Sequence, residues 1–121
     1  MSYFFVFLGG GLGSLFRFFI SRLCAKFFPF FPLGTMISNF LGMFLIGFLS
    51  ILILDKNAII SPYREMILVG FIGGLTTFSS FGYETYVLLA QSRWIDFFIY
   101  FFGNLFVGFF LFMIGRILGN L

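Results

Sequence analysis

GGLTTFSSFGYE, residues 73–84, places six consecutive Thr, Phe and Ser residues inside the apolar stretch Met66–Ala90. That stretch is long enough to cross a membrane, where lipid satisfies no backbone or hydroxyl group. Glycine is a poor helix former, and Ser and Thr side chains compete for backbone hydrogen bonds. We therefore predict a membrane-spanning helix with a break near residues 74–79. The alternative is a kink whose hydroxyl groups bond back to the preceding turn.

The composition of the whole chain indicates a membrane protein. Of its 121 residues, 61% are hydrophobic and 9% are charged, against roughly 25% charged in an average soluble domain. Apolar runs of about 20 residues, enough to cross a hydrocarbon core roughly 30 Å thick, recur along the sequence. They are Tyr3–Leu23, Leu33–Leu54, Met66–Ala90 and Ile95–Leu118. We predict an all-α membrane protein with four transmembrane helices in a single domain, residues 1–121.

Several other classes of protein are disfavoured. The chain has one cysteine and no histidine, so it offers neither an intrachain disulfide nor a Ser/His/Asp set, and we do not expect an enzyme. The net charge of +3 comes from basic residues scattered at helix ends, where they would meet lipid headgroups rather than nucleic acid. The first apolar run lacks a basic start and contains Arg17, so we expect a retained helix rather than a signal peptide.

The basic residues give no clear orientation in the membrane. Lys and Arg accumulate on the cytoplasmic side of membrane proteins, but here three lie on each side if both termini share one face. The two sets are Lys56, Arg64 and Arg116, and Arg22, Lys26 and Arg93. We infer that the chain inserts in both directions and that opposite copies pair as an antiparallel homodimer in the lipid bilayer. The alternative is that a tie among six charges carries no information.

Small residues favour close helix association. Membrane helices are held together by packing, and glycine lets their backbones approach. Three pairs have the Gly-x-x-x-Gly spacing: Gly9 with Gly13, Gly70 with Gly74, and Gly115 with Gly119. Because the chain has 15 glycines, each motif is a weak signal by itself.

Polar side chains recur on helical faces at membrane depth. Two pairs are spaced i,i+4, and a third set steps by three residues. They are Thr35 with Asn39, Tyr100 with Asn104, and Phe78 with Phe81 and Glu84. A buried Asn strands its donors unless something accepts from them, and a small anion could do so. The alternative is that these side chains only join helices to one another by hydrogen bonds.

The aromatic pair beside the break is a second indication of an anion path. The chain has 24 phenylalanines, but Phe78 and Phe81 lie on one helical face beside the hydroxyl residues Ser79 and Ser80. Aromatic rings are positive at their edges, so two rings presented edge-on can accept an anion in place of water. An unwound turn also favours a cation at its carbonyls and an anion at the following helix N-terminus.

Three motifs resemble the Fluc (CrcB) fluoride channels over nearly the whole chain. They are GGGLGSLFR at Gly9–Arg17, PLGTMISNFLGMFLIGFL at Pro32–Leu49, and GFIGGLTTFSSFGYE at Gly70–Glu84. Members of that family are four-helix, dual-topology antiparallel homodimers with two pores around a central sodium ion. The resemblance implies passive export of cytoplasmic fluoride through the bacterial inner membrane, giving fluoride resistance, without an organic cofactor.

The resemblance also implies roles for individual residues. Phe78 and Phe81 match the pore phenylalanines, and Asn39 matches a pore-lining asparagine. Other residues expected along the pore are Thr35, Glu84, Tyr100, Ser79, Ser80 and Asn104. The carbonyl groups of Gly73 and Thr76 match those that hold sodium, and Arg17 matches an arginine near the aqueous vestibule. Asn104 and Gly108 depart from the family, which often carries serines there.

Two other functions fit parts of the sequence. A proton-coupled small multidrug exporter is also a compact four-helix protein of dual topology, but such exporters carry a Glu in the first helix, and here Glu84 lies in the third. A small membrane scaffold or holin-like protein would account for the hydrophobicity and glycine spacing. It would leave Asn39, Glu84 and the hydroxyl run unexplained.

Overall fold

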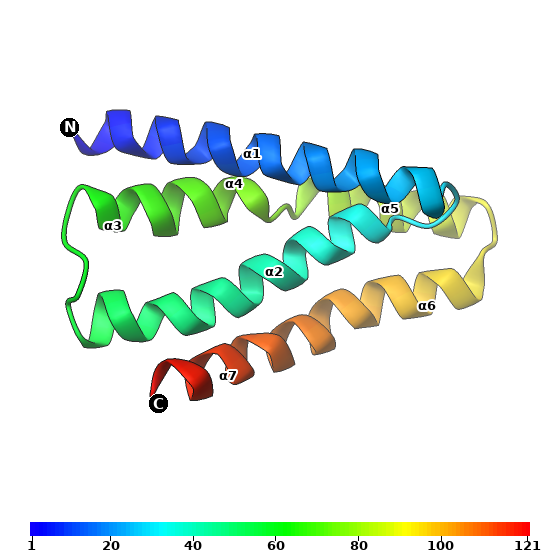
Figure 1. Cartoon of the computed structure of the whole chain (residues 1–121). Coiled ribbons are helices and arrows are strands. Elements are labelled where there is room, and N and C mark those ends of the chain that lie inside the picture. Colours follow the sequence, from blue (N-terminus) through cyan, green and yellow to red (C-terminus); the bar gives the residue numbers. More distant parts are fainter.

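Four long helical segments lie side by side in the computed structural model, which describes residues 1–121 (Figure 1). All four are long and apolar enough to cross a membrane, which confirms the predicted all-helical class and the four transmembrane helices. The first segment is α1, Ser2–Phe27. The second is α2, Leu33–Ser50, continued by the π-helical turn η1, Ile51–Asp55.

The third and fourth segments are each built from several pieces. The third consists of α3, Tyr63–Glu65, η2, Met66–Ile72, α4, Gly73–Leu75, and α5, Ser79–Ala90. The fourth consists of α6, Trp94–Phe102, η3, Gly103–Val107, and α7, Gly108–Gly119. The connections between segments are short, and both chain termini lie at the same end of the molecule (Figure 1).

The helices extend beyond the apolar runs that predicted them. The first helix was predicted to end at Leu23 but continues to Phe27, because basic side chains such as Lys26 do not interrupt a helix and can reach the headgroups. It ends before Pro29, whose ring disfavours helical backbone in the residue before it. The third segment begins at Tyr63, directly after Pro62, three residues earlier than predicted.

Glycine allows α1 to pack tightly on the first half of the third segment. Gly9 and Gly13 are buried, and a Cβ atom at either would collide with the backbone carbonyl of Met66 or Phe71, respectively. Gly74, in α4 of the third segment, packs in turn against the backbone of α1. The two Gly-x-x-x-Gly motifs of these segments therefore face each other within one chain, as close backbone packing requires.

The second half of the third segment packs differently. Its buried residues Phe81 and Leu88 form a core cluster with Met36 of α2 and Tyr100 of α6, against which four phenylalanines pack. The third segment is thus divided between two packing environments. Between them, residues 76–78 belong to no helix, and Thr76 has extended backbone angles, φ −87° and ψ 156°.

Candidate functional site

Asn39 holds the non-helical residues 76–78 from the neighbouring helix α2. Its side-chain oxygen accepts a hydrogen bond from the Thr77 backbone N–H at 2.9 Å, and its Nδ2 lies 3.4 Å from the Thr77 carbonyl oxygen. The Thr77 hydroxyl in turn accepts from the Ser80 N–H at 3.2 Å and so satisfies a backbone donor in the first turn of α5. Backbone groups that lose their helical partners at membrane depth need replacements such as these.

Arg17 supplies another hydrogen-bond partner for the backbone near the break. Its Nε donates to the Gly74 carbonyl oxygen at 3.0 Å, so the side chain predicted to lie near a vestibule contacts the end of α4. The Ile72 carbonyl accepts from both the N–H and the hydroxyl of Thr76, at 3.0 Å each. By contrast, the carbonyl groups of Gly73 and Thr76 accept none of the hydrogen bonds made in this segment.

Glu84 is the centre of a second polar cluster. The Thr35 hydroxyl donates to Glu84 Oε1 at 2.9 Å, and the Tyr100 hydroxyl donates to Oε2 at 2.5 Å. Thr35 and Tyr100 are buried and come from α2 and α6, while Glu84 comes from α5. Because a charged carboxylate in a membrane is costly, two converging hydroxyl donors give this side chain the protein partners that it needs.

Asn104 connects the hydrogen bonds around Thr77 with those around Glu84. Its side-chain oxygen accepts a hydrogen bond from Asn39 Nδ2 at 3.0 Å, and its own Nδ2 donates to the Tyr100 carbonyl oxygen at 2.8 Å. Polar groups consequently lie along a line from Thr77 to Glu84 across three of the four segments, and the line passes from Asn104 to Glu84 through the backbone carbonyl and the hydroxyl of Tyr100. The line brings together residues that the sequence placed on separate helical faces.

The two phenylalanines of the break have different surroundings. Their ring centroids lie 5.9 Å apart, so the rings are neighbours. Phe81 is only 6% exposed and packs against Tyr100, with centroids 5.6 Å apart. Phe78 is 82% exposed. The neighbouring Ser79 hydroxyl lies 3.3 Å from that of Thr77.

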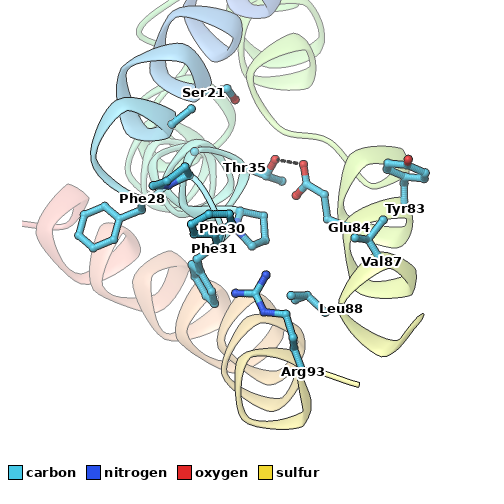
Figure 2. Close-up of a pocket in the computed structure, with 14 residues that line it drawn as sticks. Ser21, Phe28, Phe30, Phe31, Thr35, Tyr83, Glu84, Val87, Leu88 and Arg93 are labelled. Atoms are coloured by element: carbon cyan, nitrogen blue, oxygen red, sulfur yellow. Dashed lines mark hydrogen bonds between the residues drawn. The ribbon is translucent and has the colours of Figure 1, made fainter. Parts of the chain in front are cut away.

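Cavities lie at both ends of this polar line. The first cavity, of about 360 Å³, is lined by residues of α1, the α1–α2 connection, α2, α5 and Arg93. Thr35 and Glu84 face each other in it and are joined by their hydrogen bond (Figure 2). The second cavity, of about 380 Å³, lies beside residues 76–78. Its lining includes Asn39, Thr76, Thr77, Phe78, Phe81 and Asn104.

Two residues of the site were not singled out from the sequence. Thr77 was one of the hydroxyl residues of the break, but its double contact with Asn39 depends on the approach of α2. Arg93 was counted only as a loop charge, yet it lines the first cavity. Its position directly before an apolar run gave no indication that the side chain turns inward.

Comparison with known proteins identifies relatives over the full chain. Residues 4–116 match the family described as "CrcB-like protein, Camphor Resistance (CrcB)". The "Fluoride-specific ion channel FluC" of Hydrogenobaculum sp. (strain Y04AAS1) is 42% identical over 121 residues, which are 100% of this chain and 99% of that protein. The protein of the same name from Aquifex aeolicus (strain VF5) is 39% identical over 93% of this chain and 92% of its own length. The one from Thermosipho melanesiensis is 40% identical over 99% and 97%, respectively.

Proposed function

Because the chain belongs to the CrcB-like family, we propose that it is a fluoride-selective ion channel of the membrane. The observation that carries this proposal is the line of polar and aromatic side chains from Thr77 to Glu84, with a cavity at each end. Its relatives are named as fluoride-specific channels. No nucleotide or proton coupling is required for passive flow down an electrochemical gradient.

The hydrogen-bond chemistry of the line suits a small anion. Fluoride is strongly hydrated, so a path through the membrane has to replace its water with other donors. The hydroxyl groups of Thr35 and Tyr100 already converge on the two oxygens of Glu84. We propose that a passing fluoride ion takes these donors in turn as the carboxylate moves aside. The amide of Asn39 supplies a further donor when one of its present acceptors is displaced, and Ser79 and Ser80 directly follow the break.

Phe78 and Phe81 supply a different kind of contact. The edges of aromatic rings carry partial positive charge, so two neighbouring rings can face an anion without strong hydrogen bonds. Phe81 is fixed by its packing on Tyr100, whereas Phe78 is exposed on the surface of the single chain. We propose that a second copy of the chain covers Phe78, and that each of two pores is lined by residues of both copies.

The proposed dimer is antiparallel and contains a structural sodium ion. The even division of basic residues between the two faces supports dual insertion. The free carbonyl groups of Gly73 and Thr76 lie in the non-helical region and its flank, and hard cations prefer such oxygen ligands. Paired with the same groups of an inverted copy, they would give four oxygens around one sodium ion.

We further propose that the channel exports cytoplasmic fluoride across the bacterial inner membrane and so gives fluoride resistance. Hydrogen fluoride crosses membranes as a neutral molecule and dissociates inside the cell. An inside-negative potential then drives the anion outward, at about 2.3 kcal/mol per charge per 100 mV. A passive path is sufficient for this purpose.

Fluoride efflux from liposomes tests the proposal directly. Purified protein is reconstituted, and release of trapped fluoride is followed with a fluoride electrode after the membrane potential is clamped. Parallel vesicles loaded with chloride are the control. We expect rapid fluoride release and no comparable chloride release. Absence of fluoride release, or equal release of both ions, would refute the channel function.

A further inference from the structure

We propose that Arg93 forms an anion-binding site in the first cavity, at one mouth of the fluoride path, and that Asp96 sets the strength of this site. The inference rests on the proposed function and adds a residue to it. Its ligand is a small inorganic anion, which on this path is fluoride. Three observations support it: the position of the Arg93 side chain, its ion pair with Asp96, and the distribution of charge around the cavity.

The turn between α5 and α6 directs Arg93 into the cavity. The Arg93 N–H donates to the Leu88 carbonyl oxygen at 2.9 Å, and its carbonyl accepts from the Phe97 N–H at 2.9 Å. The backbone is therefore fixed on both sides of the residue. From there the guanidinium reaches into the space between Phe31 and Leu88, on the side of the cavity opposite Thr35 and Glu84 (Figure 2).

Asp96 pairs with Arg93 from outside the cavity. Arg93 donates from Nε at 3.0 Å and from Nη2 at 2.6 Å to the same oxygen, Asp96 Oδ2. A guanidinium has five N–H donors, so this pair leaves donors free. Asp96 does not line the first cavity, and no ion pair joins Arg93 to Glu84. The free donors thus face a space that is open to an anion.

Arg93 is the only basic residue that lines this cavity. Two other basic residues, Arg22 and Lys26, lie near the same end of the molecule but outside the lining. The Arg22 guanidinium lies over the Phe18 ring, 5.6 Å from its centroid, and Lys26 is exposed at the end of α1. An anion that leaves the hydroxyl donors around Glu84 would therefore meet Arg93 as the one positive charge of the cavity lining.

A positive charge at a mouth raises the local concentration of the permeating anion. Removing it should weaken binding, whereas removing the neighbouring negative charge should strengthen binding. Arg93→Gln and Asp96→Asn are consequently expected to act in opposite directions. A merely structural ion pair would not give this result, because either substitution breaks the same contact.

The experiment measures fluoride flux into liposomes as a function of fluoride concentration, at low ionic strength. We expect Arg93→Gln to raise the half-saturating concentration ~3-fold or more and Asp96→Asn to lower it. Lys26→Gln removes a charge from the same end of the molecule without touching the cavity, and should leave the concentration unchanged. Added salt of an impermeant anion should reduce the differences, because ions screen exposed charges.

The outcomes separate this inference from the proposed function. If wild-type protein conducts fluoride but Arg93→Gln matches Lys26→Gln, the anion site is wrong and the channel function stands. If Asp96→Asn shifts the half-saturating concentration in the same direction as Arg93→Gln, the pair has a structural role and the inference is again wrong. Arg93→Lys keeps the charge and should retain most of the wild-type affinity, even if Arg93→Gln is poorly folded. If wild-type protein carries no fluoride, the proposed function itself fails.

Discussion

The side-chain Nδ2 of Asn39 on α2 donates a hydrogen bond to the side-chain oxygen of Asn104 in η3, 3.0 Å away. The same nitrogen lies 3.4 Å from the Thr77 carbonyl oxygen, so both of its hydrogens have protein acceptors. An anion that binds this amide must displace one of these two acceptors. Asn104 therefore competes with the proposed substrate for a donor.

Substitution of Asn104 tests this competition. Asn104→Ser shortens the side chain and should free the Asn39 amide, raising fluoride flux by about twofold to fivefold, as the loss of one ordinary hydrogen bond would allow. Asn104→Asp places a negative charge on the path and should lower flux by about tenfold or more. Liposome efflux measures both variants, and gel filtration checks that they assemble like the wild type. Equal flux in the aspartate variant and the wild type would show that Asn104 does not lie on the path.

Replacement of the aromatic pair should separate transport from stability. Phe78→Ile and Phe81→Ile both remove the ring and should sharply reduce fluoride flux, because the positive ring edge is lost. Phe81→Ile should also lower the stability of the single chain by about 1–2 kcal/mol, because Phe81 is buried in its core. Phe78→Ile should affect stability only through the proposed contact with the second copy, because Phe78 is exposed on the single chain. Flux assays and thermal unfolding in detergent measure the two effects. Phe7→Ile, at another exposed position, is the control. Unchanged flux in both pore variants would show that the two rings serve only in packing.

Alanine substitution in α1 should show which glycines bring the helices together. A Cβ at Gly13 would collide with the Phe71 carbonyl and lie 2.9 Å from the Leu75 nitrogen, whereas one at Gly11 would meet nothing within 4 Å. Gly13→Ala should destabilise the protein by about 1–3 kcal/mol through overpacking. Gly11→Ala should be neutral or stabilising, since alanine favours the helix by about 1 kcal/mol. Thermal unfolding in detergent compares them, and equal midpoints would contradict this packing.

Sodium removal tests the proposed cation site. Protein purified and reconstituted without sodium should lose fluoride flux, and added sodium should restore it, because the Gly73 and Thr76 carbonyls would otherwise face each other without a ligand. Potassium, which is larger, should restore less. Vesicles prepared in sodium throughout provide the reference rate. If flux is the same with and without sodium, these carbonyl groups serve another purpose.

The sequence was sufficient to predict the four apolar segments, because membrane thickness and hydrophobicity determine their length. It was less informative about helix ends, where charged residues such as Lys26 continue α1 beyond its apolar run. The pairing of residues across helices could not be read from the sequence. Helical spacing placed Asn39 and Asn104 on faces of their own helices, but their hydrogen bond spans 65 positions and depends on how α2 meets η3.

The same limit applies to the surroundings of single side chains. The sequence predicts that Phe78 and Phe81, which have identical chemistry, share one helical face, yet Phe78 is exposed and Phe81 is in the core. Arg17 lay in a motif that suggested a vestibule, but its contact with Gly74 required the close approach of α1. Such contacts depend on the arrangement of segments in space, which periodicity does not encode.

The division of the third segment has a mechanical consequence. Its first half is held to α1 through glycine contacts, and its second half is held to α2 and α6 through the core around Phe81. Residues 76–78, which belong to no helix, join these two halves. If the helices tilt when lipid composition alters the hydrophobic thickness, the load falls on this junction, because the two halves are held by different neighbours. The proposed permeation path therefore passes the point where such a load would be transmitted from one half of the segment to the other.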